Sequence, residues 1–152
     1  MSIATCIWFQ RDMKVALARY LSLFPDSELI SSQQLGGEHP AELAQWRMLG
    51  ASFRGICAPS NFEPNEAVSL SITCADQAEV DRYWYGLLDG GGLEAMCGWL
   101  RDPWGVWWQI VPDALGALLA DPVAARAQAA RQQLFTQRRI VIAELQAAAD
   151  AA

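Results

Sequence analysis

Short runs of β-forming residues alternate along this chain with segments whose apolar residues recur at helical spacing. The first run is Thr5–Gln10, and Asp12 follows it at the N-cap position of a helical pattern that Pro25 ends. The apolar positions of that pattern are Met13, Leu17, Tyr20, Leu21 and Phe24. The pattern predicts a strand followed by an amphipathic helix.

A second strand and helix follow in the same order. Ser69–Cys74 is rich in β-formers, and Asp76 with Glu79 three residues later has the spacing of a capping box. The apolar positions of the second helix are Val80, Tyr83, Trp84, Leu87 and Leu88. The glycines Gly90–Gly92 follow this helix and predict its end.

The two strand–helix units are related by one sequence offset. The matching pairs, each 64 residues apart, are Asp12 and Asp76, Tyr20 and Trp84, and Phe24 and Leu88. The N-cap residue and the apolar helix positions of the two units therefore match at the same offset, which indicates an internal repeat.

Each unit continues into further strands. We expect Ser27–Ser32, Ala44–Leu49 and Ser52–Ala58 after the first helix, and Leu93–Cys97, Trp99–Arg101 and Val106–Val111 after the second. Asp102–Gly105 reads as a turn, and Gln33–Glu42 as a long mobile loop. The pattern therefore predicts an α+β fold of tandem βαβββ modules that form a curved mixed sheet with flanking helices.

The C-terminal third is helical instead. Asp113 is expected to cap a helix over Ala114–Ala120, and Pro122 to open a second helix that runs to Thr136. A last helix is expected over Ile140–Ala149, and the whole tail should pack on the body or on a second subunit. We therefore expect a single domain over residues 1–152, with module one at 1–60, module two at 66–112 and C-terminal helices at 113–150.

Composition and charge narrow the classes of function. Hydrophobic residues make up 53% of the 152 residues, which argues against disorder. The formal net charge of −6 repels phosphate backbones, so nucleic acid is not an expected partner. Residues 1–10 lack the pattern of a signal peptide, and no stretch has the apolar length of a membrane span. We expect a cytoplasmic protein without a membrane partner.

Metal ligands of the usual kinds are scarce. The cysteines Cys6, Cys57, Cys74 and Cys97 are well separated, and His39 is the only histidine. The chain therefore has too few clustered cysteines and histidines for a Cys/His zinc site. We expect the cysteines to be reduced and to serve as small residues of the core.

Several stretches resemble one known family. They are Tyr20–Ser27, Glu79–Trp84, Cys97–Pro112 and the tail segment Ala114–Pro122. Together with the tandem βαβββ pattern, they are similar to the PhnB-like, or 3-demethylubiquinone 3-methyltransferase-like, branch of the vicinal-oxygen-chelate superfamily. That superfamily also includes glyoxalases, bleomycin-resistance proteins and extradiol dioxygenases. The resemblance implies the two-module fold and homodimer formation.

The resemblance also implies positions for a divalent metal, which in the superfamily's enzymes acts as a Lewis acid on the substrate. Those positions fall on Thr5, Ser69 and Gln109, with a fourth near Cys57. None of the four is His, Asp or Glu, so no metal and no cofactor are expected. The methyltransferase label is not supported either, because no strand and Gly-rich turn precede a helix as an S-adenosylmethionine site would need.

Strand alternation then indicates which side chains share a face. Ser69, Ser71 and Thr73 form a polar face, and Trp107 with Gln109 share a face of the last strand. In the first strand, Thr5, Ile7 and Phe9 are expected on the equivalent face. The candidate ligand-binding residues are therefore Thr5, Cys57, Ser69, Ser71, Thr73, Trp107 and Gln109.

Three functions remain open from the sequence. The first is metal-free binding of a small molecule in the concave sheet cavity. The second is a metal-dependent lyase, isomerase or dioxygenase that recruits Cys57, Gln109 or His39. The third is an assembly protein without a small-molecule site. No catalytic residue is identified, and whether the protein is an enzyme stays open.

Overall fold

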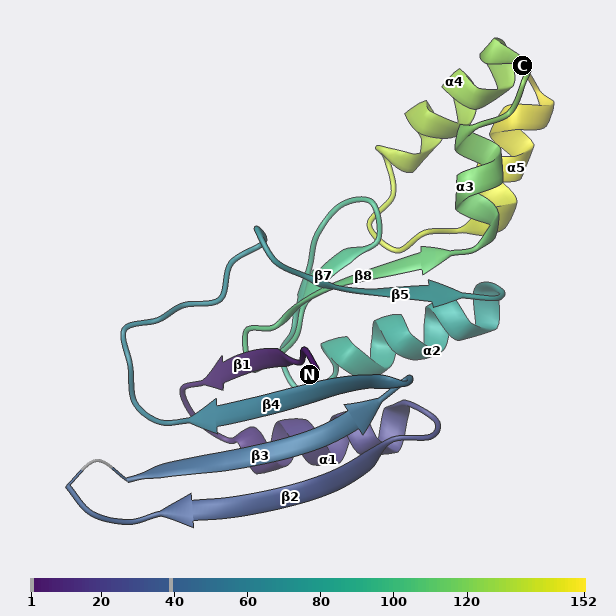
Figure 1. The fold of residues 1–152 in the computed structure, drawn as a ribbon. Helices are drawn as coiled ribbons and strands as arrows, with labels where there is room; N and C mark the ends of the chain where they lie inside the picture. Colours follow the sequence, from purple (N-terminus) through teal and green to yellow (C-terminus); the bar gives the residue numbers. More distant parts are fainter. Residues whose placement is uncertain (1, 39) are drawn as a thin grey trace. The chain divides into compact units, whose positions relative to one another are not determined.

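The computed structural model describes residues 2–38 and 40–152, so His39 lies outside the described residues. The chain divides into two compact units, Met1–Asn65 and Glu66–Ala152 (Figure 1). An irregular stretch, residues 58–69, connects the last strand of the first unit to the first strand of the second.

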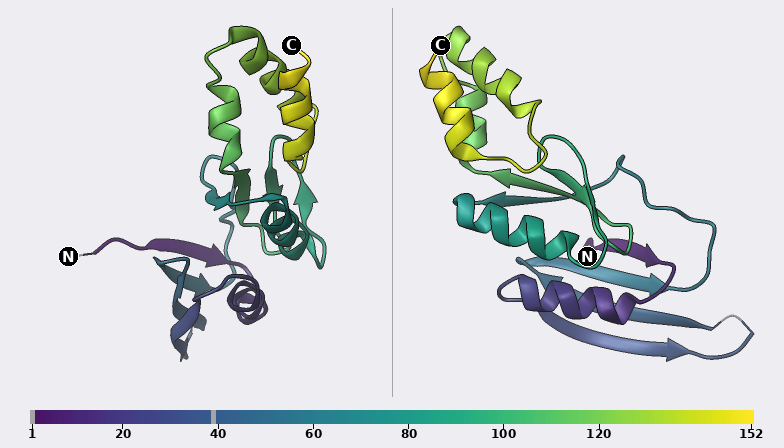
Figure 2. Two further views of the ribbon diagram at one scale, coloured as in Figure 1. Left: turned by 90° about the vertical axis from the view of Figure 1, so that its right-hand side faces the viewer. Right: turned by 180° about the vertical axis from the view of Figure 1, so that it is seen from behind.

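The first unit is a four-stranded sheet with one helix on one of its faces (Figure 2). Its elements are β1 (Thr5–Phe9), α1 (Met13–Leu23), β2 (Glu28–Leu35), β3 (Ala41–Met48) and β4 (Ala51–Cys57). The strand order is β1-β4-β3-β2, with β1 parallel to β4 and the other neighbours antiparallel. Phe9, Met13, Tyr20 and Trp46 are fully buried and form the core of this unit.

The second unit repeats this plan and adds three helices. Its sheet elements are β5 (Leu70–Cys74), α2 (Gln77–Leu88), β6 (Leu93–Glu94), β7 (Trp99–Arg101) and β8 (Trp107–Pro112). The strand order is β5-β8-β7-β6, and β5 is parallel to β8. Val80, Trp84 and Leu87 of α2 are buried, as are Trp108 and Ile110 of the sheet.

The identical strand order of the two sheets confirms the predicted α+β fold of tandem βαβββ modules. Among the described residues the strands form two four-stranded mixed sheets, one in each unit. Each helix packs on the sheet of its own module: α1 contacts β2 and β4, and α2 contacts β5, β7 and β8.

The helix starts confirm one predicted cap and correct another. The Asp76 carboxylate accepts the N–H of Glu79 at 2.9 Å, and the Glu79 carboxylate accepts the N–H of Ala75 at 2.8 Å. Asp12 stands at the N-cap of α1, but its side chain caps nothing and its backbone is left-handed, with φ of 56°. A capping side chain reaches the first turn from an extended backbone, which Asp12 does not have.

The C-terminal helices are α3 (Ala114–Leu119), α4 (Ala124–Leu134) and α5 (Ile142–Asp150). The expected side-chain cap from Asp113 does not form. Pro122 is not the first residue of α4, because the Asp121 carboxylate accepts the N–H of Val123 at 2.8 Å and forms a turn before the helix begins. No helix in the described part of the chain is long and apolar enough to cross a membrane.

The predicted loop Gln33–Glu42 was also wrong. β2 runs on to Leu35 and β3 begins at Ala41, and these two residues pair at the end of the hairpin. The polar side chains of this segment are compatible with a strand because all of β2 is exposed. Only residues 36–40 connect the two strands.

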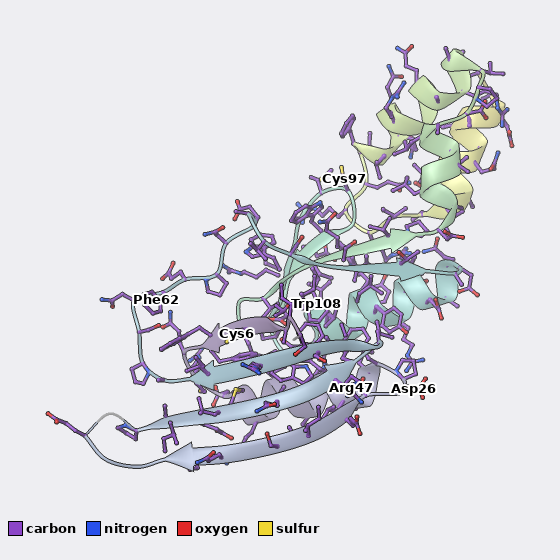
Figure 3. All side chains as sticks on the ribbon, viewed as in Figure 1. Cys6, Asp26, Arg47, Phe62, Cys97 and Trp108 are labelled. Atoms are coloured by element: carbon purple, nitrogen blue, oxygen red, sulfur yellow. The ribbon has the colours of Figure 1, made fainter. Side chains whose placement is uncertain are left out.

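The three C-terminal helices pack on one another and on the second module. The sequence predicted that they pack either on the body of the protein or on a second subunit, and the structure shows the first arrangement. Their shared core is formed by Leu115, Leu118, Ala130, Leu134, Ile140, Leu145 and Ala149. The segment between α4 and α5 reaches the loop before β7, where the N–H groups of Cys97 and Gly98 each donate at 2.7 Å to the carbonyls of Gln137 and Arg138 (Figure 3).

Candidate functional site

The second sheet has one apolar face and one polar face. Ile72 and Cys74 of β5, with Trp108 and Ile110 of β8, are buried on the side that α2 covers. The side chains between them point the opposite way, because strand residues alternate. We define the polar face of the second sheet by these residues: Ser69, Ser71, Thr73, Trp99, Arg101, Trp107, Gln109 and Val111.

The strand pairing arranges this face in rows. Gln109 is flanked by Ser71 on β5 and by Trp99 on β7. Trp107 pairs with Arg101, whose guanidinium lies 5.9 Å from the centre of the indole ring. The predicted residues Ser69, Ser71, Thr73, Trp107 and Gln109 therefore lie together on one face, as expected from the alternation of their strands.

Gln109 is held in place by a neighbour on this face. Its side-chain N–H donates to the hydroxyl of Ser69 at 2.7 Å. The amide oxygen of Gln109 and the hydroxyls of Ser71 and Thr73 make no further side-chain hydrogen bond within the described chain, so they stay available as hydrogen-bonding groups. The indole N–H of Trp107 is buried without an acceptor among the described residues. Buried donors are normally paired, so this group favours an acceptor beside it.

The C-terminal helices close one end of the polar face. Val111, which pairs with Thr73, packs against the apolar cluster of these helices. Cys97 of the loop before β7 packs against the same cluster. The face therefore runs from an apolar end at Val111 through the amide of Gln109 to the ring of Trp107.

Sequence reasoning missed two members of this face. Trp99 and Arg101 lie on it because β7 pairs antiparallel with β8 and brings them beside Gln109 and Trp107. The signal was present in the sequence, since residues 99 and 101 alternate around the buried Leu100.

Two predicted residues lie elsewhere. A Cβ built on Gly55 would stand 2.5 Å from the sulfur of Met13 in α1, so this position of β4 faces the helix. Ile7 pairs with Gly55, and Thr5 and Cys57 lie two residues away on the same side of their strands. The placement of Thr5, Ile7, Phe9 and Cys57 on a ligand-binding face was therefore wrong: they share the face that α1 covers.

The face of the first sheet opposite α1 instead carries Cys6 and Trp8 of β1 with Arg54 of β4. Trp8 is tied to the end of its own unit: its indole N–H donates to the carbonyl of Ala58 at 2.9 Å, and its ring meets Phe62 edge-on at 5.2 Å. Arg47 lies on the same face and is paired with Glu28 at 2.7 Å.

These residues do not fit the divalent metal that the superfamily's enzymes use. The polar face of the second sheet offers hydroxyls and a neutral amide where hard or borderline cations require carboxylate or imidazole ligands. The face of the first sheet opposite α1 carries Arg54, which repels a cation, and Arg47, whose charge is paired with Glu28. Within residues 2–38 and 40–152, no three His, Cys, Asp or Glu side chains are grouped closely enough to hold an ion.

An S-adenosylmethionine site finds no support in the described fold either. Gly90–Gly92 follow α2 rather than a strand, and the N–H of Gly92 donates at 2.8 Å to the carbonyl of Leu88 to end that helix. The turns that lead from β1 to α1 and from β5 to α2 contain no glycine. The phosphate- and cofactor-binding turn of a Rossmann-type enzyme depends on such glycines.

The buried Cys74 and the half-buried Cys97 are poor nucleophiles. Burial, reinforced by the carboxylates of Glu79 and Asp76, raises the pKa of Cys74 to about 12. Burial also raises the pKa of Cys97, whose thiol donates to the carbonyl of Leu134 at 3.6 Å. Since the thiolate is the reactive form, neither residue is activated for catalysis.

The fold places this protein in the vicinal-oxygen-chelate, or glyoxalase-like, superfamily. The family described as 3-demethylubiquinone-9 3-methyltransferase matches residues 1–111, and the chain belongs to that family. No curated protein matches the chain.

Solved structures agree with this assignment. A putative 3-demethylubiquinone-9 3-methyltransferase, PhnB protein, from Bacillus cereus is 28% identical, with a TM-score of 0.66 over 74% of this chain and 99% of that chain. The fosfomycin resistance protein FosX from Mesorhizobium loti is 12% identical, with a TM-score of 0.57 over 79% of this chain and 97% of that chain. Protein PA1353 from Pseudomonas aeruginosa is 19% identical, with a TM-score of 0.53 over 74% and 99%. The last two show the fold alone.

The family match ends before the C-terminal helices. It stops at residue 111, so the expected resemblance over Ala114–Pro122 is not part of it. The helices α3, α4 and α5 follow the matched region.

Proposed function

We propose that this protein binds a small molecule on the polar face of the second sheet without the help of a divalent metal. The observation that carries the proposal is the gathering of Ser71, Thr73 and Gln109 beside Trp107, with Gln109 fixed by its bond to Ser69. Ligand sites typically combine apolar and aromatic walls with a few fixed polar groups that set orientation.

The chemistry of the face indicates the class of ligand. Hydroxyls and an amide can both donate and accept hydrogen bonds, which suits a neutral or weakly polar molecule. Trp107 and Trp99 offer aromatic surface for a ring or an apolar part of the ligand. Arg101 is the one cation on the face and lies at its Trp107 end.

Binding is favoured over catalysis by the residues of this face. It carries no carboxylate, imidazole or thiol that could act as an acid, base or nucleophile. We therefore propose sequestration or sensing. The metal-dependent alternative would recruit Cys57, Gln109 or His39. Cys57 shares the face that α1 covers, and Gln109 offers only a neutral amide.

A thermal-shift screen of small metabolites on protein stripped of metal with EDTA tests this proposal. We expect at least one compound to raise Tm, and Ser71→Ala/Thr73→Val to reduce that shift, because a ligand that binds only the folded state stabilises it. Stabilisation by Zn²⁺, Mn²⁺, Ni²⁺ or Fe²⁺ alone, with no response to any metabolite, would refute the metal-free proposal.

We propose further that the protein is a cytoplasmic homodimer. Proteins of this superfamily commonly pair as dimers. Cys6, Cys57, Cys74 and Cys97 are all free thiols, which is the usual state of cysteines in a reducing compartment.

A further inference from the structure

We infer that two copies of this chain associate along β2, whose free edge pairs antiparallel with β2 of the second copy. This inference rests on the proposed homodimer and identifies the surface that forms it. β2 is the outermost strand of the first sheet, with β3 as its partner in the described chain (Figure 1). Its outer N–H and C=O groups therefore form a row that another strand can use.

β2 offers the longest free edge in the described sheets. It has eight residues, whereas the other terminal strands, β1, β5 and β6, have five, five and two. All eight residues of β2 are exposed, including Leu29, Ile30 and Leu35, which are 47%, 51% and 37% exposed. An antiparallel partner of this length would add on the order of eight main-chain hydrogen bonds.

β2 lacks most of the features that prevent edge strands of different molecules from pairing. Natural edge strands are usually protected by lysine, proline, short length or a bulge. β2 carries no lysine and no proline, and its single charged residue, Glu28, is neutralised by Arg47 of β3 at 2.7 Å. The one protective feature is a bulge between Leu29 and Ser31, which leaves the stretch from Ser31 to Leu35 regular.

Charge and symmetry favour a second copy as the occupant. The chain carries a net charge of −6, so two copies repel each other except where they meet through a neutral surface. β2 is such a surface. A two-fold axis perpendicular to the strand makes identical edges antiparallel, and it places small side chains such as Ser31 and Ser32 near the axis.

Lysines on β2 test the inference directly. Sedimentation of the wild-type chain at micromolar concentration is expected to show a dimer. In Ser31→Lys/Gln33→Lys, like charges would face each other near the axis, and we expect the dimer dissociation constant to rise at least about tenfold. The control is Gln45→Lys/Ser52→Lys, which adds two lysines to exposed positions on the same face of the inner strands β3 and β4. This control should remain dimeric.

Cross-linking decides the question if the β2 lysine variant does not fold by circular dichroism. Ser32→Cys treated with a short bismaleimide should yield more covalent dimer than the wild type or Ser52→Cys. A monomeric wild type would overturn both the homodimer and this interface. A dimer that persists in a folded β2 lysine variant would overturn the β2 interface alone. Neither result bears on ligand binding, which has its own test.

Discussion

Gln109 of β8 donates its side-chain amide to the hydroxyl of Ser69, the residue that precedes β5, across 2.7 Å. The bond links the neighbouring parallel strands β5 and β8 on the sheet face opposite α2. A free glutamine side chain samples many rotamers, and ordering it costs free energy when a ligand binds. Gln109 is already ordered, so its amide oxygen is presented in a fixed place beside Ser71.

This bond predicts a coupling between the two residues. Gln109→Leu and Ser69→Ala each remove one partner of a half-buried hydrogen bond, so their effects on the free energy of unfolding should not add. We expect a coupling energy of about 0.5–1.5 kcal/mol in a double-mutant cycle measured by urea unfolding. Strict additivity would mean that the bond is not formed in solution.

Gly98 is predicted to be indispensable for packing the C-terminal segment. Its φ is +82°, and a Cβ there would stand 2.7 Å from the carbonyl oxygen of Ile110 and 2.9 Å from the Ile140 side chain. Gly98→Ala should lower the free energy of unfolding by about 2–4 kcal/mol, because neither the backbone nor its neighbours can adjust cheaply.

Gly116 is the matched control for that substitution. It lies exposed in α3, with nothing within 4 Å of an added Cβ. Gly116→Ala should raise stability by up to about 1 kcal/mol, since alanine is the better helix former. Equal effects of the two substitutions in thermal unfolding would contradict the described packing of the Gly98 loop.

Gln77 is predicted to hold the start of α5. Its side-chain oxygen accepts the N–H of Ile142 at 2.9 Å, and its side-chain N–H donates to the carbonyl of Ile140 at 3.1 Å. Gln77→Leu leaves both backbone groups without these partners, so we expect a loss of about 1–3 kcal/mol and faster hydrogen exchange at Ile142. Gln146→Leu, which removes an exposed bond to Asp150, should change stability by less than about 0.5 kcal/mol.

Cys74 makes stability depend on alkaline pH. Burial raises its folded pKa to about 12 from an ordinary value of 9.0, so the unfolded chain loses this proton first. The folded state keeps its full advantage below about pH 9 and loses it progressively as pH rises toward 12. Between these limits, Cys74→Ala should weaken the fall of the unfolding free energy with pH. Parallel profiles of the two proteins in urea titrations from pH 8 upward would argue against this role.

The repeat and its two helices could be predicted because the N-cap residues and the apolar helix positions recur at one sequence offset. The error over Thr5 came from extending that offset to the strands. The helix residues Tyr20 and Trp84 are 64 apart, but the buried strand ends Phe9 and Cys74 are 65 apart. One additional residue therefore lies in the turn before α1, where Asp12 adopts its left-handed backbone. Because strand faces alternate, a shift of one residue moves every side chain to the other face.

The second module was predictable because its strands alternate strictly. Ser71 and Thr73 are exposed while Ile72 and Cys74 are buried, which is the pattern that the sequence indicates. The hairpin of β2 and β3 was not predictable in this way. An edge strand that is exposed on both faces has no apolar period, so its polar residues, such as Gln33 and Gln34, resemble a loop.

The most direct test of metal-free binding is a calorimetric titration of the best metabolite from the thermal-shift screen, with EDTA present throughout. We predict measurable binding to the wild type and at least a tenfold weaker Kd for Gln109→Leu. Gln45→Leu, an exposed glutamine on the face of the first sheet opposite α1, should bind like the wild type. Binding that appears only when a divalent metal replaces EDTA, or that is unchanged in Gln109→Leu, would contradict the account.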